Sequence, residues 1–192
     1  DRERTIALFS AHGVPHPASV LVETSRPASA TFHGPCWVKR GDVHATEAGD
    51  VAHAGSAGEL TVNLERLSAR GIPHAVVQAH VPGDLVKFYG VAGLPEDAGR
   101  PSWFEWFHHR DQELRRYAFD AQALAATASA AARALGLDVY GGDAIVSARG
   151  AISIIDVNAW PSFALFRPVA AARIAALLAS PFQREAALGA AG

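Results

Sequence analysis

Two short apolar segments that meet at Arg149-Gly150 constrain the fold more than any other part of the chain. Both segments are rich in isoleucine and valine, which favour strands, and a two-residue loop with glycine suits a tight hairpin. With this loop, Ser147 pairs with Ile152, and Asp143 lies directly opposite Asp156. The sequence therefore predicts an antiparallel hairpin that carries two carboxylates on one face.

The facing carboxylates predict a metal site. Two like charges opposite each other in an apolar hairpin are unfavourable unless a cation lies between them. Asn158 follows Asp156 by two residues and so shares its face. Carboxylate and amide oxygens suit Mg²⁺, with phosphate oxygens completing an octahedral shell. We expect Asp143, Asp156 and Asn158 to bind Mg²⁺, or Mn²⁺ in its place; the alternative is that both aspartates lie in solvent at the open end of the hairpin.

Composition and charge narrow the function classes. The chain has 192 residues and a net charge of -2, which gives no reason to expect a nucleic acid or an anionic membrane as partner. The single cysteine, Cys36, excludes an internal disulfide and a multi-cysteine zinc site, and its apolar neighbours predict a buried thiol. One cysteine, no secretory signal and no apolar run of about 18 residues predict a cytoplasmic protein. The chain has no methionine and begins at Asp1, which we interpret as a fragment of a longer polypeptide.

Helix and strand signals alternate along the chain and also pair as hairpins, which is typical of the α+β class. Helices are predicted over 2–12, from the capping box of Ser56 and Glu59 to Gly71, over 120–135 and from Pro168 onward. Strands are predicted over 20–22, 36–39, 75–81, 85–91, 143–147 and 152–157. Between them we expect a glycine-containing loop over 40–58 and an irregular aromatic segment over 92–117.

Two lysines at strand positions are candidates for anion binding. Lys39 ends an apolar strand and opens the loop, where its ammonium can serve as a point charge against phosphate. The alternative is a lysine that extends from a strand end into solvent. Lys87 lies among apolar neighbours and requires an anionic partner. That partner is either a bound phosphate or an aspartate or glutamate on the same sheet face.

The strand over 75–81 meets a break at Pro82-Gly83 and offers an edge for an adenine ring. Adenine needs one carbonyl and one N–H from such an edge, together with apolar walls. The residues of this strand are mostly apolar, so the strand can supply such walls.

Together these parts resemble the ATP-grasp superfamily. They follow its order: Lys39 on a strand, a glycine-containing loop, a helix, a hinge strand with Gln78, then Asp143, and finally an acid-x-Asn motif at Asp156. The resemblance covers the chain from about Gly13 onward and is nearest the branch of the ribosomal-protein glutamate ligases and inositol trisphosphate 5/6-kinases. It implies an α+β fold of two lobes, 1–82 and 83–192, each with an antiparallel sheet and helices, and a nucleotide between them.

The resemblance also implies roles for single residues. Those expected to contact ATP are Lys39 at the phosphates, Gln78 with the backbone of Ala79 and Val81 at adenine, and Asp84 at the ribose. Those expected to act on the acceptor are Lys87, which would also face the γ-phosphate, and Arg167, near the aromatic segment. Mg²⁺ would be held by Asp143, Asp156 and Asn158.

This sequence departs from the family pattern in several places. Asp156 replaces the commoner glutamate, and Gln78 stands where glutamate is frequent. Acidic residues and a histidine replace a short Gly-Ser run in the loop: Asp42, His44, Glu47 and Asp50. The family's N-terminal domain, which usually helps to bind the acceptor, is absent from these residues.

The function implied by the resemblance is an ATP- and Mg²⁺-dependent ligase that joins a carboxylate to an amine or thiol through an acyl phosphate. The alternatives are a kinase for a small molecule such as an inositol phosphate, and an ATP-binding module without chemistry. Expected partners are small-molecule or peptide substrates and the N-terminal domain of the same polypeptide.

Overall fold

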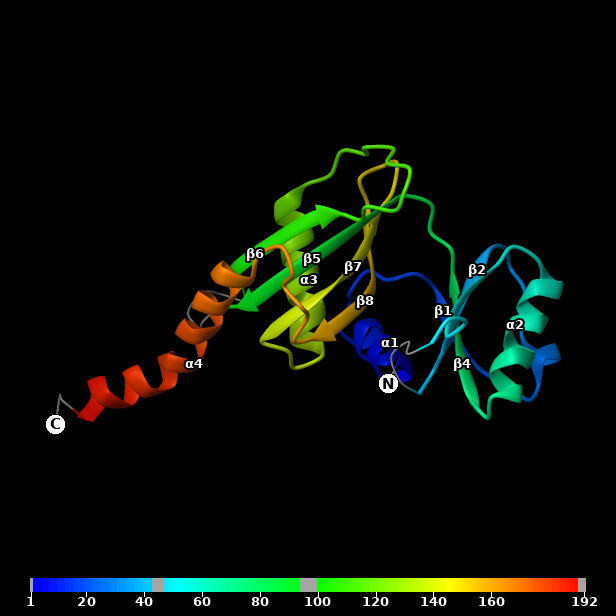
Figure 1. The fold of residues 1–192 in the computed structure, drawn as a ribbon, viewed down its shortest axis with the longest axis horizontal. Helices are drawn as coiled ribbons and strands as arrows, with labels where there is room; N and C mark the ends of the chain where they lie inside the picture. The colour runs from blue at the N-terminus through cyan, green and yellow to red at the C-terminus, as the bar shows by residue number, and fades with distance from the viewer. Residues whose placement is uncertain (1, 43–46, 94–99, 190–192) are drawn as a thin grey trace. The chain divides into compact units, whose positions relative to one another are not determined.

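The computed structural model describes residues 2–42, 47–93 and 100–189, the last nine of these by their backbone alone. The chain forms two compact units, Asp1–Pro82 and Gly83–Gly192, which we call unit 1 and unit 2 (Figure 1). Each unit contains one four-stranded sheet in which all neighbouring strands run antiparallel. No helix in the described part of the chain is long and apolar enough to cross a lipid bilayer.

Unit 1 has its sheet in the order β1-β4-β2-β3. Its elements are α1 (Arg2–Ala11), β1 (Ser19–Glu23), the short turn η1 (Pro27–Ser29), β2 (Cys36–Arg40), β3 (Val51–Ala54), α2 (Ala57–Ala69) and β4 (His74–Ala79). The helix α2 begins where the sequence predicts, because the Ser56 hydroxyl accepts the backbone N–H of Glu59 at 3.2 Å.

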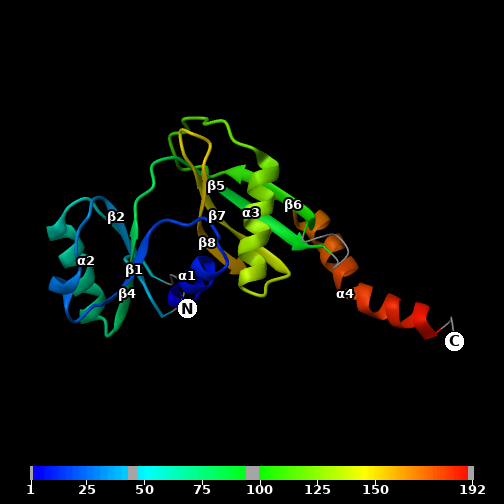
Figure 2. The same ribbon diagram turned by 180° about the vertical axis from the view of Figure 1, so that it is seen from behind.

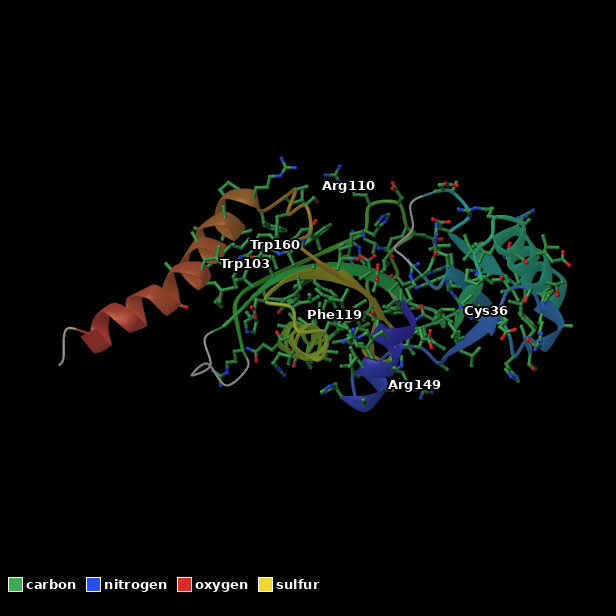
Figure 3. The ribbon with its side chains drawn as sticks, turned by 90° about the horizontal axis from the view of Figure 1, so that it is seen from below. Cys36, Trp103, Arg110, Phe119, Arg149 and Trp160 are labelled. Carbon is green, nitrogen blue, oxygen red and sulfur yellow. The ribbon has the colours of Figure 1, made fainter. Side chains whose placement is uncertain are left out.

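The core of unit 1 lies between α2 and one face of the sheet. Leu60, Leu64 and Leu67 recur at helical spacing and pack with Cys36 and Val38 of β2. Cys36, labelled in Figure 3, is buried as predicted, and burial raises the pKa of its thiol. The opposite sheet face is therefore available to the polar side chains that alternate with these residues along β2.

The loop expected over 40–58 is interrupted by β3, which the sequence analysis did not predict. Its four residues, Val51–Ala54, include two alanines and a histidine and show no clear apolar alternation. Pairing with β2 makes the strand: Cys36 lies opposite Ala54, and Lys39 lies opposite Val51. The actual loop is the shorter connection between β2 and β3, and His44 in it lies outside the described residues.

Unit 2 has its sheet in the order β6-β5-β7-β8. Its elements are β5 (Asp84–Ala92), β6 (Pro101–His108), α3 (Ala121–Ala134), β7 (Val139–Val146), β8 (Ile152–Ala159) and α4 (Arg167–Gly189). α3 packs along one face of this sheet against β5, β6 and β8, as Figure 2 shows. Buried side chains of this layer are Val86, Phe88, Leu124, Ala128, Ala131 and Ala144.

Residues 101–108 of the aromatic segment expected to be irregular form the edge strand β6, while residues 109–117 contain no helix or strand, as predicted. Its aromatic side chains serve both faces of the sheet, so the sequence lacks the apolar-polar alternation of a half-buried strand. Trp106 packs edge-on against Phe119, with ring centroids 4.9 Å apart. Trp103 packs against Phe163 and Phe166, close to the start of α4 (Figure 3). Two covered faces explain why the prediction of an irregular segment was wrong for residues 101–108.

Candidate functional site

The predicted metal-binding residues of unit 2 share one face of its sheet. Asp143 on β7 lies directly opposite Asp156 on β8, and Asn158 lies opposite Gly141. The Tyr140 hydroxyl bonds to Ser129 of α3 at 2.9 Å, so Asp143, three residues on, faces away from α3. All three candidate side chains are partly exposed on this open face.

The loop of the hairpin and the strand pairing next to it differ from the predicted ones, although Asp143 still pairs with Asp156. Gly150 has φ of 75° and donates its N–H to Ser147, whose own N–H bonds to Ala151, so the loop has three residues. Val146, and not Ser147, therefore pairs with Ile152. An extra residue in β8, Ile155, forms a β-bulge that restores the predicted pairing further along. The predicted loop was wrong, while the predicted pair of Asp143 and Asp156 is confirmed.

Lys87 extends the carboxylate pair across a third strand. It lies opposite Asp143 in the β5–β7 ladder, and its Nζ is 2.8 Å from Asp143 Oδ1. Their side chains are 32% and 26% exposed, so the ion pair is accessible to solvent and ligands. The alternative expected from the sequence, an ion pair on the sheet face, is therefore present. Its acid is one of the predicted metal ligands, which places Lys87, Asp143 and Asp156 in one row.

The oxygen atoms of this row fit a divalent cation. Asp156 Oδ2 accepts a 3.2 Å hydrogen bond from the Asn158 amide, and Asp143 Oδ1 accepts one from Lys87. Within the described residues this leaves one oxygen of each of the three side chains, a number that suits Mg²⁺ with phosphate and water completing its shell. In the described residues, no group of three or more His, Cys, Asp or Glu side chains is placed so that it could hold a metal ion by itself. A metal here would thus need the Asn158 oxygen as well as the carboxylates.

In unit 1, Lys39 and Gln78 meet on the sheet face opposite α2. Trp37 of β2 lies opposite Gln78 of β4, and Lys39, two residues on, shares their face. The Lys39 ammonium donates to Gln78 Oε1 at 2.7 Å, and Gln78 Nε2 donates to the Ser19 hydroxyl at 3.3 Å. Gln78 is only 5% exposed, so a buried amide holds the lysine in place.

The end of β4 keeps part of the expected adenine edge. The Ala79 N–H donates to Ala18 O at 2.8 Å, and the His80 N–H donates to Pro35 O at 2.9 Å. Val81 makes no backbone hydrogen bond to any described residue, so its N–H can donate a hydrogen bond to a ligand. The N–H of Ala79 is engaged within the sheet, which leaves its carbonyl as the group to consider.

Three aromatic side chains beside this edge were not predicted from the sequence as part of a site. Trp37 Nε1 donates to His80 Nδ1 at 3.2 Å, and the ring of His53 lies 5.1 Å from Trp37 and 5.6 Å from His80 between centroids. His53 and Trp37 are register partners on β3 and β2. Finding them required β3, which gave no clear signal in the sequence.

Asp84 is placed differently from its expected role at the ribose. It is 1% exposed, and its two carboxylate oxygens accept the backbone N–H groups of Arg115 and Tyr117 at 2.8 and 2.9 Å. Burial raises the pKa of this carboxyl, but the N–H donors outweigh that effect and hold the pKa below its ordinary value. Because its oxygens already fix the segment before α3, Asp84 stabilises unit 2 and is not available to a ribose.

The acidic residues of the unit 1 loop also serve the fold. Asp50 is fully buried and pairs with Arg70 at 2.7 Å and with Arg40 at 3.4 Å. Arg40 binds both oxygens of Asp42, at 2.8 and 2.9 Å, and Glu47 pairs with Arg70 at 3.2 Å. These contacts explain the departure from a Gly-Ser run, because the acids anchor the loop to β2 and α2.

Arg167, expected near the acceptor, is the first residue of α4 and is exposed. Its Nε donates to Ser162 O at 3.3 Å. No hydrogen bond or ion pair among the described residues links it to the row of Lys87, Asp143 and Asp156. Its role in acceptor binding stays a prediction.

Solved structures match this chain, although no protein-family model and no curated protein does. The RimK domain ATP-grasp protein of Sphaerobacter thermophilus is 17% identical, with a TM-score of 0.60 over 82% of this chain and 58% of that one. The ATP-grasp ligase PsnB, complexed with a minimal precursor, Mg and ADP, is 22% identical, with a TM-score of 0.63 over 91% and 57%. The D-alanine–D-alanine ligase of Bacillus anthracis is 14% identical, with a TM-score of 0.64 over 91% and 62%.

The likeness of these three proteins to this chain lies in the fold. The chain spans a little over half the length of each of them. Its two antiparallel sheets with helices agree with the α+β class expected from the sequence. The chain therefore has the ATP-grasp fold.

Proposed function

We propose that this chain is the nucleotide-binding part of an ATP- and Mg²⁺-dependent ligase that joins a carboxylate to an amine or thiol. The observation that carries the proposal is the row of Lys87, Asp143 and Asp156 on one sheet face, with Asn158 beside it. A cation next to paired carboxylates suits the binding of a metal–phosphate complex, in which positive and negative groups alternate. The ATP-grasp fold supports the same assignment by analogy.

Unit 1 would supply the groups that recognise the nucleotide. Lys39, held by Gln78, would place a positive charge at the phosphates. The Val81 N–H and the Ala79 carbonyl would bind the edge of adenine. Trp37 and His80 lie on the same region of unit 1 and would offer an aromatic surface beside that edge. We assign no nucleotide contact to Asp84.

Unit 2 would supply the metal ligands and a second cation. Asp143, Asp156 and Asn158 would hold Mg²⁺, which when bound neutralises charge on the triphosphate. Lys87 would stabilise the charge that develops on the transferred phosphoryl group. Positioning and electrostatic stabilisation would then account for most of the rate, since phosphoryl transfer needs little covalent help from the protein.

The reaction we propose has two steps. A carboxylate oxygen of the substrate attacks the γ-phosphorus, the bond from phosphorus to the β–γ bridging oxygen breaks, and ADP leaves. The amine or thiol then attacks the carbonyl carbon of the acyl phosphate. Inorganic phosphate leaves with the electrons of the carbon–oxygen bond, and the nucleophile loses its proton.

The substrates would be small molecules or peptides that carry these groups. PsnB, one of the similar proteins, was solved with its precursor peptide PsnA2, and others are amino acid ligases. Because this chain spans only part of those proteins, we propose that a further domain of the same polypeptide helps to bind the acceptor. Arg167 and the partly exposed Phe166 beside it would be the contribution of unit 2.

Hydroxylamine trapping tests the proposed reaction on the full polypeptide. Candidate carboxylic acids are supplied with ATP, Mg²⁺ and hydroxylamine, and both ADP and hydroxamate are measured. A ligase forms hydroxamate with its own acid, and Asp156→Ala should form none. The matched control is Glu113→Gln, an acid of unit 2 whose side chain is 82% exposed. ADP release with a phosphorylated hydroxyl and no hydroxamate would indicate a kinase instead.

A further inference from the structure

The ion pair of Lys87 and Asp143 places an ammonium beside a carboxylate that we assign to the metal. We propose that Lys87 is an internal cation that occupies this carboxylate until Mg²⁺ arrives with ATP, so that metal binding depends on the nucleotide. The inference rests on the proposed function, since it concerns the same metal ligands. It goes further in two ways: Mg²⁺ binds together with ATP, and the Lys87 ammonium then moves from Asp143 to a phosphate oxygen.

An ion pair and a hydrogen bond within the row already compensate its two carboxylates. Asp143 and Asp156 lie directly opposite each other, and their like charges would repel without compensation. Lys87 compensates Asp143 through its 2.8 Å ion pair, and the Asn158 amide donates to Asp156 at 3.2 Å. A free metal ion must therefore compete with an ammonium that is already in place. We expect its affinity without nucleotide to be low for that reason.

ATP changes this balance because it brings both ligands and charge. Its phosphate oxygens complete the shell of the metal, and they offer the ammonium of Lys87 a new anionic partner. The Lys87 side chain is 32% exposed, so its ammonium can leave Asp143 without crossing the core. On the other side of Lys87 its register partner is Phe107, which carries no charge to hold it. Transfer of the ammonium from Asp143 to phosphate would free one more oxygen for Mg²⁺.

The choice of lysine at this position supports an exchangeable contact. Lys39 and Lys87 are the only lysines in the chain, and the other basic residues among its 17 are arginines. Arg40 in unit 1 shows how an arginine binds a carboxylate, because its guanidinium binds both oxygens of Asp42 at once. A lysine makes a single contact through a flexible stem and exchanges partners more easily. The two lysines of the chain thus stand at the two positions that we assign to phosphate.

The test measures Mn²⁺ binding to the full polypeptide by electron paramagnetic resonance, with and without a non-hydrolysable ATP analogue. The wild type should bind Mn²⁺ weakly alone and much more tightly with the analogue. Lys87→Met removes the internal cation, so we expect Mn²⁺ to bind about tenfold more tightly without nucleotide. The same variant should bind the analogue more weakly. These opposite shifts would not arise from a general loss of structure.

Three further variants make the result specific. Lys87→Arg keeps the charge and should retain weak Mn²⁺ binding without nucleotide. Arg149→Met removes a cation from the exposed loop of the same hairpin and should leave nucleotide-free Mn²⁺ binding unchanged. Asp143→Asn removes a proposed ligand and should abolish Mn²⁺ binding in both conditions. Lys87→Gln replaces Lys87→Met if circular dichroism shows that the latter does not fold.

Two outcomes separate this inference from the proposed function. Equal nucleotide-free Mn²⁺ affinity in the wild type and in a folded Lys87→Met, with normal tightening by the analogue, would overturn the internal cation and leave the metal site intact. Failure of the wild type to bind Mn²⁺ even with the analogue would overturn the proposed function itself.

Discussion

The Lys39 ammonium lies 2.7 Å from the side-chain oxygen of Gln78, across the β2–β4 ladder of unit 1. The amide is buried and is held in turn by the Ser19 hydroxyl. Gln78 is neutral, so its contact with the ammonium is a hydrogen bond that positions the lysine, whereas a glutamate here would form an ion pair with it. The departure from the glutamate that is frequent in the family thus has a local consequence for the phosphate-binding lysine that we propose.

Gln78→Leu should weaken binding of a non-hydrolysable ATP analogue by roughly three- to tenfold, about 1 kcal/mol, because Lys39 loses the group that positions it. Lys39→Met should cost more, about 1.5 to 3 kcal/mol, since it removes the charge itself. Isothermal titration calorimetry measures both. Ser19→Ala is the control: its hydroxyl bonds to Pro17 O and to Gln78 Nε2, while Lys39 is held by the Gln78 oxygen, so the effect should be small. Unchanged affinity in Lys39→Met would remove this residue from the nucleotide site.

In the hairpin of β7 and β8, the two paired strands could be predicted from the sequence, but the loop and the bulge could not. Isoleucine and valine on both sides of Arg149-Gly150 were enough to predict two paired strands. The loop length was wrong by one residue, and the bulge at Ile155 offset that error before Asp143. Neither feature has a strong local signal, since loop type and bulge position depend on how the strands pack against α3. The opposed carboxylates were thus predicted correctly although the detailed register was not.

Strands β3 and β6 are two elements that could not be predicted from the sequence. β3 has too few apolar residues to indicate a strand, and it exists because β2 offers it an edge. β6 has too many apolar residues to show the alternation of a half-buried strand, because aromatic rings cover both of its faces. The burial of Asp84 was equally hidden, since its N–H donors come from residues about 30 positions away. Long-range partners of this kind cannot be read from a local pattern.

Gly142→Ala should destabilise unit 2 by about 2 to 4 kcal/mol. A Cβ at this position would overlap the backbone oxygen of Asp156 and lie 2.6 Å from the Phe88 ring, so β7 and β8 would have to separate. Thermal unfolding measures the loss. Gly58→Ala is the matched control, because a Cβ there meets nothing closer than 4.0 Å and lies in α2, where alanine is favoured. Equal melting temperatures for Gly142→Ala and the wild type would contradict the close approach of the two strands.

Asp84→Asn should lower the stability of the protein near neutral pH by about 1 to 2 kcal/mol, because charged acceptors of two backbone N–H groups are lost. The folded pKa of Asp84 lies below the ordinary value of 3.8, so its ionised form contributes stability at higher pH. That contribution falls as the pH drops below 3.8 and is lost once the folded pKa is passed. Urea unfolding at several pH values should show wild type and variant converging only in this acidic range. A constant difference down to the most acidic pH would mean that the charge of Asp84 does not matter.

Asp143→Asn should abolish Mg²⁺-dependent ATP turnover while the fold remains. The substitution keeps the size of the side chain at a partly exposed position, so the sheet loses only the ion pair with Lys87. It removes the charge that a divalent cation needs at the centre of the row, opposite Asp156. ADP release by the full polypeptide is measured over a range of Mg²⁺ concentrations, with circular dichroism to confirm folding and Glu113→Gln as the surface control. If Asp143→Asn turns over ATP at the wild-type rate and with the same Mg²⁺ dependence, the metal does not bind at this hairpin, and the row of Lys87, Asp143 and Asp156 is a structural ion-pair network.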